Sequence, residues 1–151
     1  MKKEYFKIIP AVYLVLRRGT EILLLRRANT GYQDGRYSLV AGHLDGGELS
    51  RHALAREAKE EAGIDINPES LKLVHVVHSL FKNEVDQERI GLFFETREWS
   101  GDVVNMEPNK CDDLAWYPID QLPNTTIPMI RSVIGATINK VPYSEYEQEL
   151  V

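Results

Sequence analysis

The residues from Gly42 to Ile64 constrain the fold of this chain more than any other stretch. From Ser50 to Ala62 the residues are mostly good helix formers, and Gly63 then stands where glycine commonly ends a helix. The segment that precedes Ser50 contains three glycines, which let a backbone approach a ligand closely. We therefore predict a glycine-rich loop that leads into a helix over residues 50–62.

The predicted helix carries three glutamates on one face. Residues three and four apart lie side by side on a helix, so Glu57 shares its face with Glu60 and Glu61. Like charges at this spacing destabilise a helix by about 0.2–0.5 kcal/mol per pair, so helix stability gives no reason for them. One interpretation is a solvated acidic face. The other is a site for Mg²⁺ or Mn²⁺, which prefer carboxylate oxygens, with Arg56 paired to Glu48 to tie loop and helix together.

The composition narrows the class of protein. The 151 residues suit a single domain over residues 1–151 with a sizeable core, and the hydrophobic content of 43% and charged content of 27% are ordinary for a globular protein. The net charge of −5 argues against an extended nucleic-acid-binding surface. Cys111 is the sole cysteine, so no intrachain disulfide can form, and we expect a cytoplasmic protein. No apolar run has the length of a membrane span, and we interpret Ile8–Leu16 as a buried strand rather than a signal peptide.

Apolar stretches bounded by turn residues predict the strands. They are Ile8–Leu16, Glu21–Arg27, Tyr37–Ala41, Leu71–Phe81, Ile90–Trp99 and Leu114–Tyr117. The first two should form one hairpin, and the fourth and fifth another, joined by a charged turn over residues 83–88. A second helix is expected from Thr126 or Ile127 to Lys140, and residues 141–151 are expected to form a polar, loosely ordered tail. Strands mixed with two well-separated helices predict an α/β fold with helices on both faces of the sheet.

The charged positions of the first helix also match a known pattern. The spacing G-x5-E-x7-R-E-U-x-E-E-x-G-U, with U a bulky aliphatic residue, resembles the signature of the Nudix hydrolases. It runs here through Gly42, Glu48, Arg56, Glu57, Ala58, Glu60, Glu61, Gly63 and Ile64. Ala58 is smaller than the usual residue, and Leu49 replaces the usual capping residue, so we expect Ser50 to cap the helix one position later. The resemblance implies an α/β/α sandwich with a curved mixed β-sheet.

The same resemblance implies a role for each motif residue. Glu57 and Glu61 would be the principal ligands of Mg²⁺, which Mn²⁺ can replace. Glu60 would be a further ligand or the general base, and the carbonyl of Gly42 another ligand. The assignment of the general base among the glutamates stays open. The remaining charged and glycine positions would hold the motif together: Glu48, Arg56 and Gly63.

Two candidates for the site lie outside the motif. Arg27 ends a predicted strand and, in similar proteins, an arginine at this place lies near the substrate phosphates; a solvated strand-end arginine is the alternative. Many family members add one carboxylate from the loop ahead of the last strand, as a metal ligand or general base. Glu107 is our candidate for this carboxylate, and Asp112 and Asp113 compete with it.

Further residues are candidates for contact with the substrate. His43 lies in the motif loop, where it could touch phosphate or be merely solvated. Tyr37 is a candidate for base stacking, as are Tyr32, Phe81 and Trp116, although each of these aromatic residues also suits a core or a rim.

The resemblance implies hydrolysis of a nucleoside diphosphate linked to another group. The downstream proline that marks many ADP-ribose hydrolases is absent here, and the short domain favours a nucleoside triphosphate, cleaved to the monophosphate and pyrophosphate. Alternatives are a hydrolase of ADP-ribose or nucleotide sugars and a non-catalytic module that senses nucleotides. An isoprenoid diphosphate isomerase is a further alternative, but its catalytic cysteine should lie near the loop before the motif, and Cys111 lies far past that loop in sequence. The expected partner is the nucleotide alone, with the protein a monomer or a homodimer.

Overall fold

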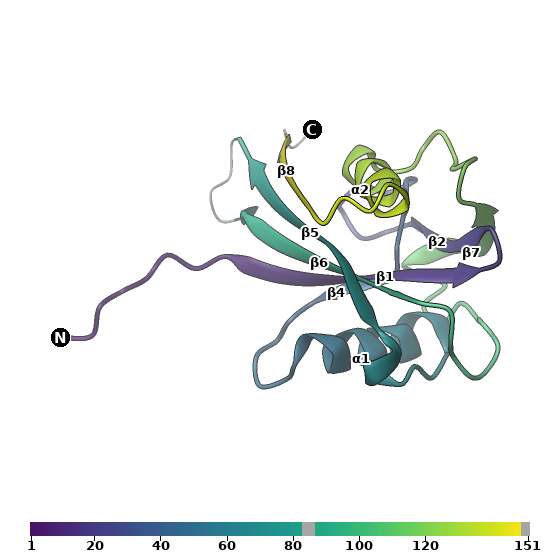
Figure 1. The fold of residues 1–151 in the computed structure, drawn as a ribbon, viewed down its shortest axis with the longest axis horizontal. Helices are drawn as coiled ribbons and strands as arrows, with labels where there is room; N and C mark the ends of the chain where they lie inside the picture. Colours follow the sequence, from purple (N-terminus) through teal and green to yellow (C-terminus); the bar gives the residue numbers. More distant parts are fainter. Residues whose placement is uncertain (83–86, 149–151) are drawn as a thin grey trace.

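The computed structural model describes residues 1–82 and 87–148. Most of the expected charged turn at residues 83–88 lies outside the described residues. The eight strands belong to one curved sheet with the order β3-β2-β1-β6-β5-β8, to which β4 adds by pairing with β1 and β7 by pairing with β2. Figure 1 shows α1 on one side of this sheet and α2 on the other. The predicted α/β/α sandwich with a mixed sheet is confirmed.

The elements follow one another along the chain in this order. They are β1 (Ile9–Arg18), β2 (Glu21–Arg27), β3 (Tyr37–Ser38), β4 (Ala41–His43), α1 (Ser50–Ala62), the short 3₁₀ helix η1 (Pro68–Ser70), β5 (Lys72–Phe81), β6 (Arg89–Thr96), β7 (Cys111–Pro118), α2 (Pro128–Ile138) and β8 (Tyr143–Gln148). Both expected hairpins form, because β1 pairs antiparallel with β2 and β5 antiparallel with β6. The described residues contain no helix long and apolar enough to cross a membrane.

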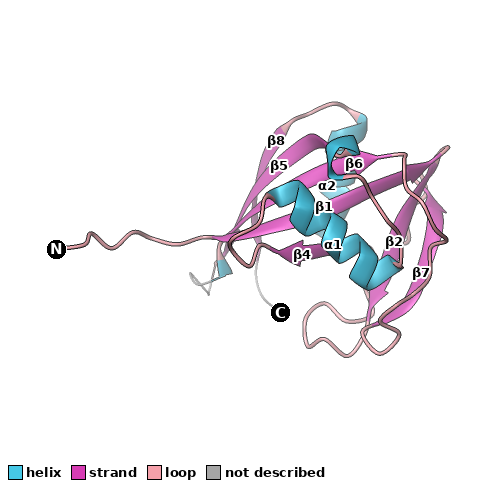
Figure 2. Cartoon of the chain, turned by 90° about the horizontal axis from the view of Figure 1, so that it is seen from below, coloured by secondary structure: helices cyan, strands magenta, loops and turns pink. Residues whose placement is uncertain are grey.

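Strand β1 lies at the centre of the molecule and divides the core into two clusters. Successive side chains of a strand point to opposite faces. Val12, Leu14 and Leu16 therefore pack in the cluster beneath α1, while the residues between them pack in the cluster beneath α2. Figure 2 shows α1 lying across the strands of the sheet. An apolar strand with two buried faces is what a sheet covered on both sides requires.

Helix α1 has the predicted bounds and buries small residues toward the sheet. Ala53, Leu54, Ala58 and Ala62 are buried, so the small side chain of Ala58 packs in the core. Gly63 ends the helix in the left-handed conformation, with φ of 70°, as its glycine predicts. The predicted cap at Ser50 is wrong: Leu49 occupies the cap position, and no side chain there accepts a hydrogen bond from the helix.

Three other predictions about the elements need correction. The strand expected over Tyr37–Ala41 is two short strands, β3 and β4, because β3 pairs with β2 whereas β4 pairs with β1. Strand β7 is longer than the predicted Leu114–Tyr117, since all of it runs along β2. The loosely ordered tail expected over residues 141–151 is wrong for residues 143–148, which form β8 parallel to β5.

Candidate functional site

Arg56 connects the loop before α1 to the glutamates of the helix. Its guanidinium donates from Nη2 to Glu48 Oε1 at 2.7 Å and from Nε to Glu48 Oε2 at 3.3 Å. Its Nη1 lies 3.0 Å from Glu57 and 3.4 Å from Glu60. The paired guanidinium lowers the pKa of Glu48, and the carboxylates of Glu48 and Glu57 raise the pKa of Arg56. The structure thus shows the ion pair that the sequence predicts between loop and helix.

Gly42 is required by the close approach of β4 to α1. A Cβ atom at this position would lie 2.3 Å from Cδ of Glu57 and 2.4 Å from its Oε1. Any residue other than glycine at this position would displace the Glu57 carboxyl, because Cβ atoms in proteins essentially never approach other heavy atoms this closely. The glycine of the motif therefore sets the position of a glutamate that lies fifteen residues later on the helix.

Glu61 is the most deeply placed carboxyl of the site. Its Oε2 accepts a hydrogen bond from the backbone N–H of Ala41 at 3.2 Å. Burial is the main reason that the pKa of Glu61 is raised to about 8, and the charges of Glu57 and Glu107 add to the effect. Burial also raises the pKa of Glu57, against the opposing effect of Arg56. A cation beside these side chains would relieve the cost of burying like charges together.

The glutamates lie around one cavity of about 490 Å³, which we call the carboxylate cavity. Its lining consists of Leu25, Arg27, Asn29, Thr30, Glu57, Glu60, Glu61, Glu107, Lys110 and Cys111. Four carboxylates around one open cavity are a donor set suited to a hard divalent cation, so the residues present fit Mg²⁺ or Mn²⁺. Among the residues that the structure describes, no three such groups already converge as a metal site. Arg56 contacts both Glu57 and Glu60 instead, so a cation would compete with this guanidinium for their oxygens.

Glu107 reaches this cavity from the loop ahead of β7. The backbone N–H of Glu107 donates to Asn105 Oδ1, and the carbonyl of Glu107 accepts from Lys110 and Cys111. The two competing aspartates have other partners. Asp112 accepts a hydrogen bond from Arg26 at 2.7 Å. Asp113 accepts from the hydroxyls of two tyrosines, Tyr37 and Tyr117.

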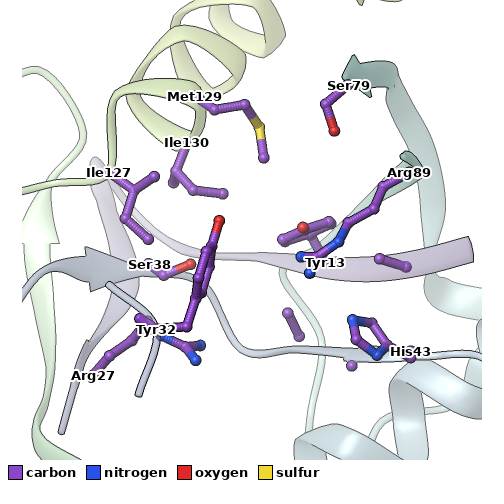
Figure 3. A pocket seen from close by; sticks show the side chains of 13 residues that line it. Tyr13, Arg27, Tyr32, Ser38, His43, Ser79, Arg89, Ile127, Met129 and Ile130 are labelled. Atoms are coloured by element: carbon purple, nitrogen blue, oxygen red, sulfur yellow. Dashed lines mark hydrogen bonds between the residues drawn. The ribbon is translucent and has the colours of Figure 1, made fainter. Parts of the chain in front are cut away.

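A second cavity of about 340 Å³ adjoins the first, and we call it the tyrosine–arginine cavity (Figure 3). Its lining consists of Ala11, Tyr13, Arg27, Tyr32, Ser38, Ala41, Gly42, His43, Ser79, Arg89, Ile127, Met129 and Ile130. Arg27 lines both cavities. Its guanidinium is held by hydrogen bonds from Nε to the Tyr32 carbonyl at 2.7 Å and from Nη2 to Thr30 Oγ1 at 3.0 Å.

The other predicted substrate contacts divide between this cavity and the core. His43 lies on β4 and lines the tyrosine–arginine cavity, where burial and the charge of Arg89 lower its pKa. Tyr37 is buried and lines neither cavity, and its hydroxyl donates to Asp113 at 2.6 Å. Of the remaining aromatic candidates, Tyr32 lines the cavity, whereas Trp116 stacks on another tryptophan.

Comparison with known proteins places the chain in a family. The model of the NUDIX domain matches residues 7–134. The chain belongs to the Nudix family. This Nudix chain is 31% identical over 124 residues to the NAD-capped RNA hydrolase NudC of Stutzerimonas stutzeri, in a match that covers 80% of the chain and 40% of that protein. It is 28% identical over 125 residues to the NudC of Chromobacterium violaceum, covering 83% and 43%. The chain thus spans about two fifths of the length of these curated relatives.

Solved structures share the fold. The MutT NUDIX hydrolase of Burkholderia pseudomallei has a TM-score of 0.77 at 23% identity, in a match that covers 86% of this chain and 98% of that one. A MutT protein of Methanosarcina mazei has a TM-score of 0.74 at 22% identity, with 88% and 94% covered. At this identity the likeness shows the Nudix fold alone.

Some residues that line the two cavities were not predicted from the sequence. Tyr13 lies within an apolar strand, and Arg89 begins β6 directly after residues whose charges predict only a turn. Lys110 is three residues from Glu107 and lines the same cavity. The alternation of β1 assigns Tyr13 to the α2 face, but only the folded sheet shows that this face opens into a cavity.

Proposed function

We propose that this Nudix protein is a divalent-metal-dependent hydrolase that cleaves a pyrophosphate bond in a nucleoside diphosphate-linked substrate. The finer proposal is a nucleoside triphosphate cleaved to the monophosphate and pyrophosphate. The observation that carries this proposal is that Arg27 lines both cavities. One of them is lined by carboxylates, and the other has aromatic and aliphatic walls. Phosphates held by a cation fit the first cavity, and the nucleoside fits the second.

Glu57, Glu60 and Glu61 would hold the metal ion, since they extend from one face of α1 into the carboxylate cavity. When bound, Mg²⁺ would neutralise the phosphate oxygens and acidify a water. Arg27 would contact the phosphates between the two cavities, and Lys110 would face the charge that develops on the departing pyrophosphate. Glu60 and Glu107 are the candidates to accept the proton of the attacking water, because both line the carboxylate cavity.

The first test is turnover of nucleotides by the full chain with Mg²⁺. We expect hydrolysis of one or more nucleoside triphosphates, and little activity of Glu61→Gln, in which the fold should remain because a buried like charge is removed. The panel should include ADP-ribose and nucleotide sugars, which test the alternative substrates. Full activity of both Glu61→Gln and Glu57→Gln at saturating Mg²⁺ would place the site elsewhere. Nucleotide binding without turnover of any compound would favour the sensing module.

The bond that breaks can be assigned with ¹⁸O-labelled water. Attack at an inner phosphorus gives the monophosphate and pyrophosphate, whereas attack at the outermost phosphorus gives the diphosphate and orthophosphate. We expect pyrophosphate among the initial products and the label on one of the two fragments. Orthophosphate as the sole initial product contradicts the finer proposal while leaving metal-dependent hydrolysis intact.

A second candidate substrate is a dinucleotide pyrophosphate. It rests on the NudC proteins, which are named as hydrolases of NAD-capped RNA, and on the 31% identity to one of them. The two arginines of the tyrosine–arginine cavity disfavour a positively charged nicotinamide ring there. Release of nicotinamide mononucleotide from NAD or from NAD-capped RNA, faster than hydrolysis of any triphosphate, would favour this candidate.

A further inference from the structure

Arg89 brings a positively charged guanidinium group into the tyrosine–arginine cavity. It is the first residue of β6, and its guanidinium lies 5.4 Å from the ring centre of Phe81 and 5.7 Å from that of Tyr32. Its Nη2 donates to Gln87 Oε1 at 3.0 Å. Within the described chain its Nε–H is buried and has no hydrogen-bond partner. A ligand in the cavity cannot reach this enclosed Nε–H, so recognition by Arg89 uses the terminal N–H groups of the guanidinium that lines the cavity.

The surroundings of Arg89 favour acceptors over donors. No carboxylate stands among the described residues that line this cavity, whereas two arginines do. The second of them, Arg27, already donates to a backbone carbonyl and a hydroxyl. Figure 3 shows the Arg89 guanidinium beside the hydroxyl of Tyr13, whose ring stacks on Phe93 with 4.4 Å between ring centres. This stack fixes the position of one neighbour of the guanidinium.

The walls of the cavity suit a flat ring. Ile127, Met129 and Ile130 line it from the start of α2, and Tyr32 reaches toward them from the opposite side (Figure 3). Aromatic and aliphatic side chains provide stacking and apolar contact for a nucleobase. The volume of about 340 Å³ falls in the lower part of the range for small-molecule sites, roughly 300–1,000 Å³.

We propose that Arg89 is a specificity-determining residue that selects a 6-oxopurine base over a 6-aminopurine base. The inference rests on the proposed function, which puts the nucleoside in this cavity. An arginine fork can donate to O6 and N7 of a 6-oxopurine at the same time. A 6-aminopurine presents an amino donor in place of O6, so one donor of the fork would face another donor. The exocyclic 2-amino group has no part in this contact.

The other ligand chemistry that an arginine recognises is a phosphate group. The three apolar side chains from α2 offer a phosphate no hydrogen bonds, and the carboxylate cavity with its cation is the place for the phosphates. The base is therefore the better occupant, and phosphate recognition by Arg89 becomes an outcome that overturns the proposal.

The test is calorimetric binding of GMP, IMP and AMP to the full chain with Mg²⁺, which the phosphate needs beside the glutamates; a nucleoside monophosphate is a product of the proposed reaction and is not turned over. We expect GMP and IMP to bind with similar dissociation constants, because both carry O6 and N7. AMP should bind between about 5- and 150-fold more weakly, the range that one bidentate arginine–base pair gives. Equal binding of AMP and GMP by the wild-type protein overturns the proposal without the need for a variant.

The matched pair of variants is Arg89→Lys and Arg17→Lys. Lysine keeps the positive charge at Arg89 but loses the fork, so the preference for GMP over AMP should fall to within about twofold. Arg17 also has a buried Nε–H without a partner, lies on β1 and pairs with Glu95 at 3.2 Å, but lines neither cavity. Arg17→Lys should keep the full preference, and a preference that survives in Arg89→Lys overturns the proposal.

Guanosine, which has no phosphate, separates base recognition from phosphate recognition. Under the proposal, Arg89→Lys weakens the binding of guanosine by the same factor as the binding of GMP. If Arg89→Lys leaves guanosine unchanged and weakens GMP and AMP equally, Arg89 binds phosphate and the proposal is wrong. Binding is measured apart from hydrolysis, so a protein that hydrolyses no triphosphate can still show the base preference. Conversely, turnover without a base preference contradicts this inference and leaves the proposed hydrolysis standing.

Discussion

At the scale of single residues, Gly42 determines where the carboxyl group of Glu57 can lie. The spacing of Glu57, Glu60 and Glu61 predicts one shared face, and the structure brings all three to one cavity. The glycine at position 42 matches the motif, but its spacing gives no physical reason for it. The reason is the missing Cβ atom, which would lie 2.3 Å from Glu57, a contact between a strand and a helix that exists only after folding.

Gly42→Ala should therefore reduce activity more than stability. The new methyl group must push the flexible end of the Glu57 side chain aside, since the two cannot share the space. A displacement of this size at a catalytic site costs roughly 10- to 100-fold in kcat. Gly135→Ala is the control, because it lies within α2 with nothing within 4 Å of its Cβ position. It should keep kcat and gain about 0.5–1 kcal/mol in the free energy of unfolding. Unchanged kcat in Gly42→Ala would show that the carboxyl position does not matter.

The carboxyl of Asp113 should make stability depend on pH in acid. The hydroxyls of Tyr117 and Tyr37 donate to it and lower its pKa below the ordinary value of 3.8. A lowered pKa in the folded state adds stability above the unfolded value, and this stability is lost as the pH falls through the folded pKa. The wild-type protein should therefore be more stable than Asp113→Asn near neutral pH, and the gap should narrow below about pH 3.8. Urea denaturation from about pH 6 to pH 2.5 measures the difference in the free energy of unfolding between the two proteins. A difference that is independent of pH contradicts a lowered pKa of Asp113.

At the scale of elements, strong local signals allowed prediction and weak ones did not. Helix α1 and strand β2 have the predicted bounds, because helix formers fill the helix and a continuous apolar run fills the strand. Strand β8 was missed, although Tyr143 to Glu147 alternate between exposed and partly buried side chains. Its inward side chains include Ser144, which is polar, so the hydrophobic signal of a strand is absent. The partner of Ser144 is His75, which is buried on β5 far away in sequence.

Ser144→Ala should destabilise the protein through this histidine. The Val141 carbonyl can only accept, so Nδ1 of His75 carries the hydrogen and donates to it at 2.7 Å. The other ring nitrogen, Nε2, then accepts from the Ser144 hydroxyl at 2.7 Å. Removal of that hydroxyl leaves a buried nitrogen without a partner, at a cost of about 1–3 kcal/mol in the free energy of unfolding. Tyr143→Phe removes an exposed hydrogen bond to Glu145 on the same strand and should change stability by less than about 0.5 kcal/mol. Equal effects of the two variants in urea denaturation would refute the role of His75.

At the scale of the whole molecule, the site depends on how the sheet folds back on itself. Strands β2 and β7 pair along their length, and this pairing carries the loop before β7 to the helix glutamates. The hydrogen bond from the Ala28 N–H to the Lys110 carbonyl at 2.9 Å closes the same junction. Sequence reasoning preferred Glu107 and kept Asp112 and Asp113 as competitors. It had no physical ground on which to exclude them, because that depends on which side chain the β2–β7 pairing turns toward α1.

The cavity favours Glu107 over Asp112 and Asp113 as the fourth carboxylate of the proposed site, and substitution tests this choice. Glu107 lines the carboxylate cavity, whereas Asp112 pairs with Arg26 and Asp113 with two tyrosine hydroxyls. If Glu107 is a metal ligand or general base, Glu107→Gln should lower kcat by at least about tenfold, near the low end of general acid–base catalysis. Asp112→Asn, at an exposed ion pair, should leave kcat and KM within about a factor of two. Asp113→Asn should reduce stability and spare kcat at a temperature well below unfolding. A large loss of kcat at either aspartate with none at Glu107 would assign the fourth carboxylate of the site to that aspartate.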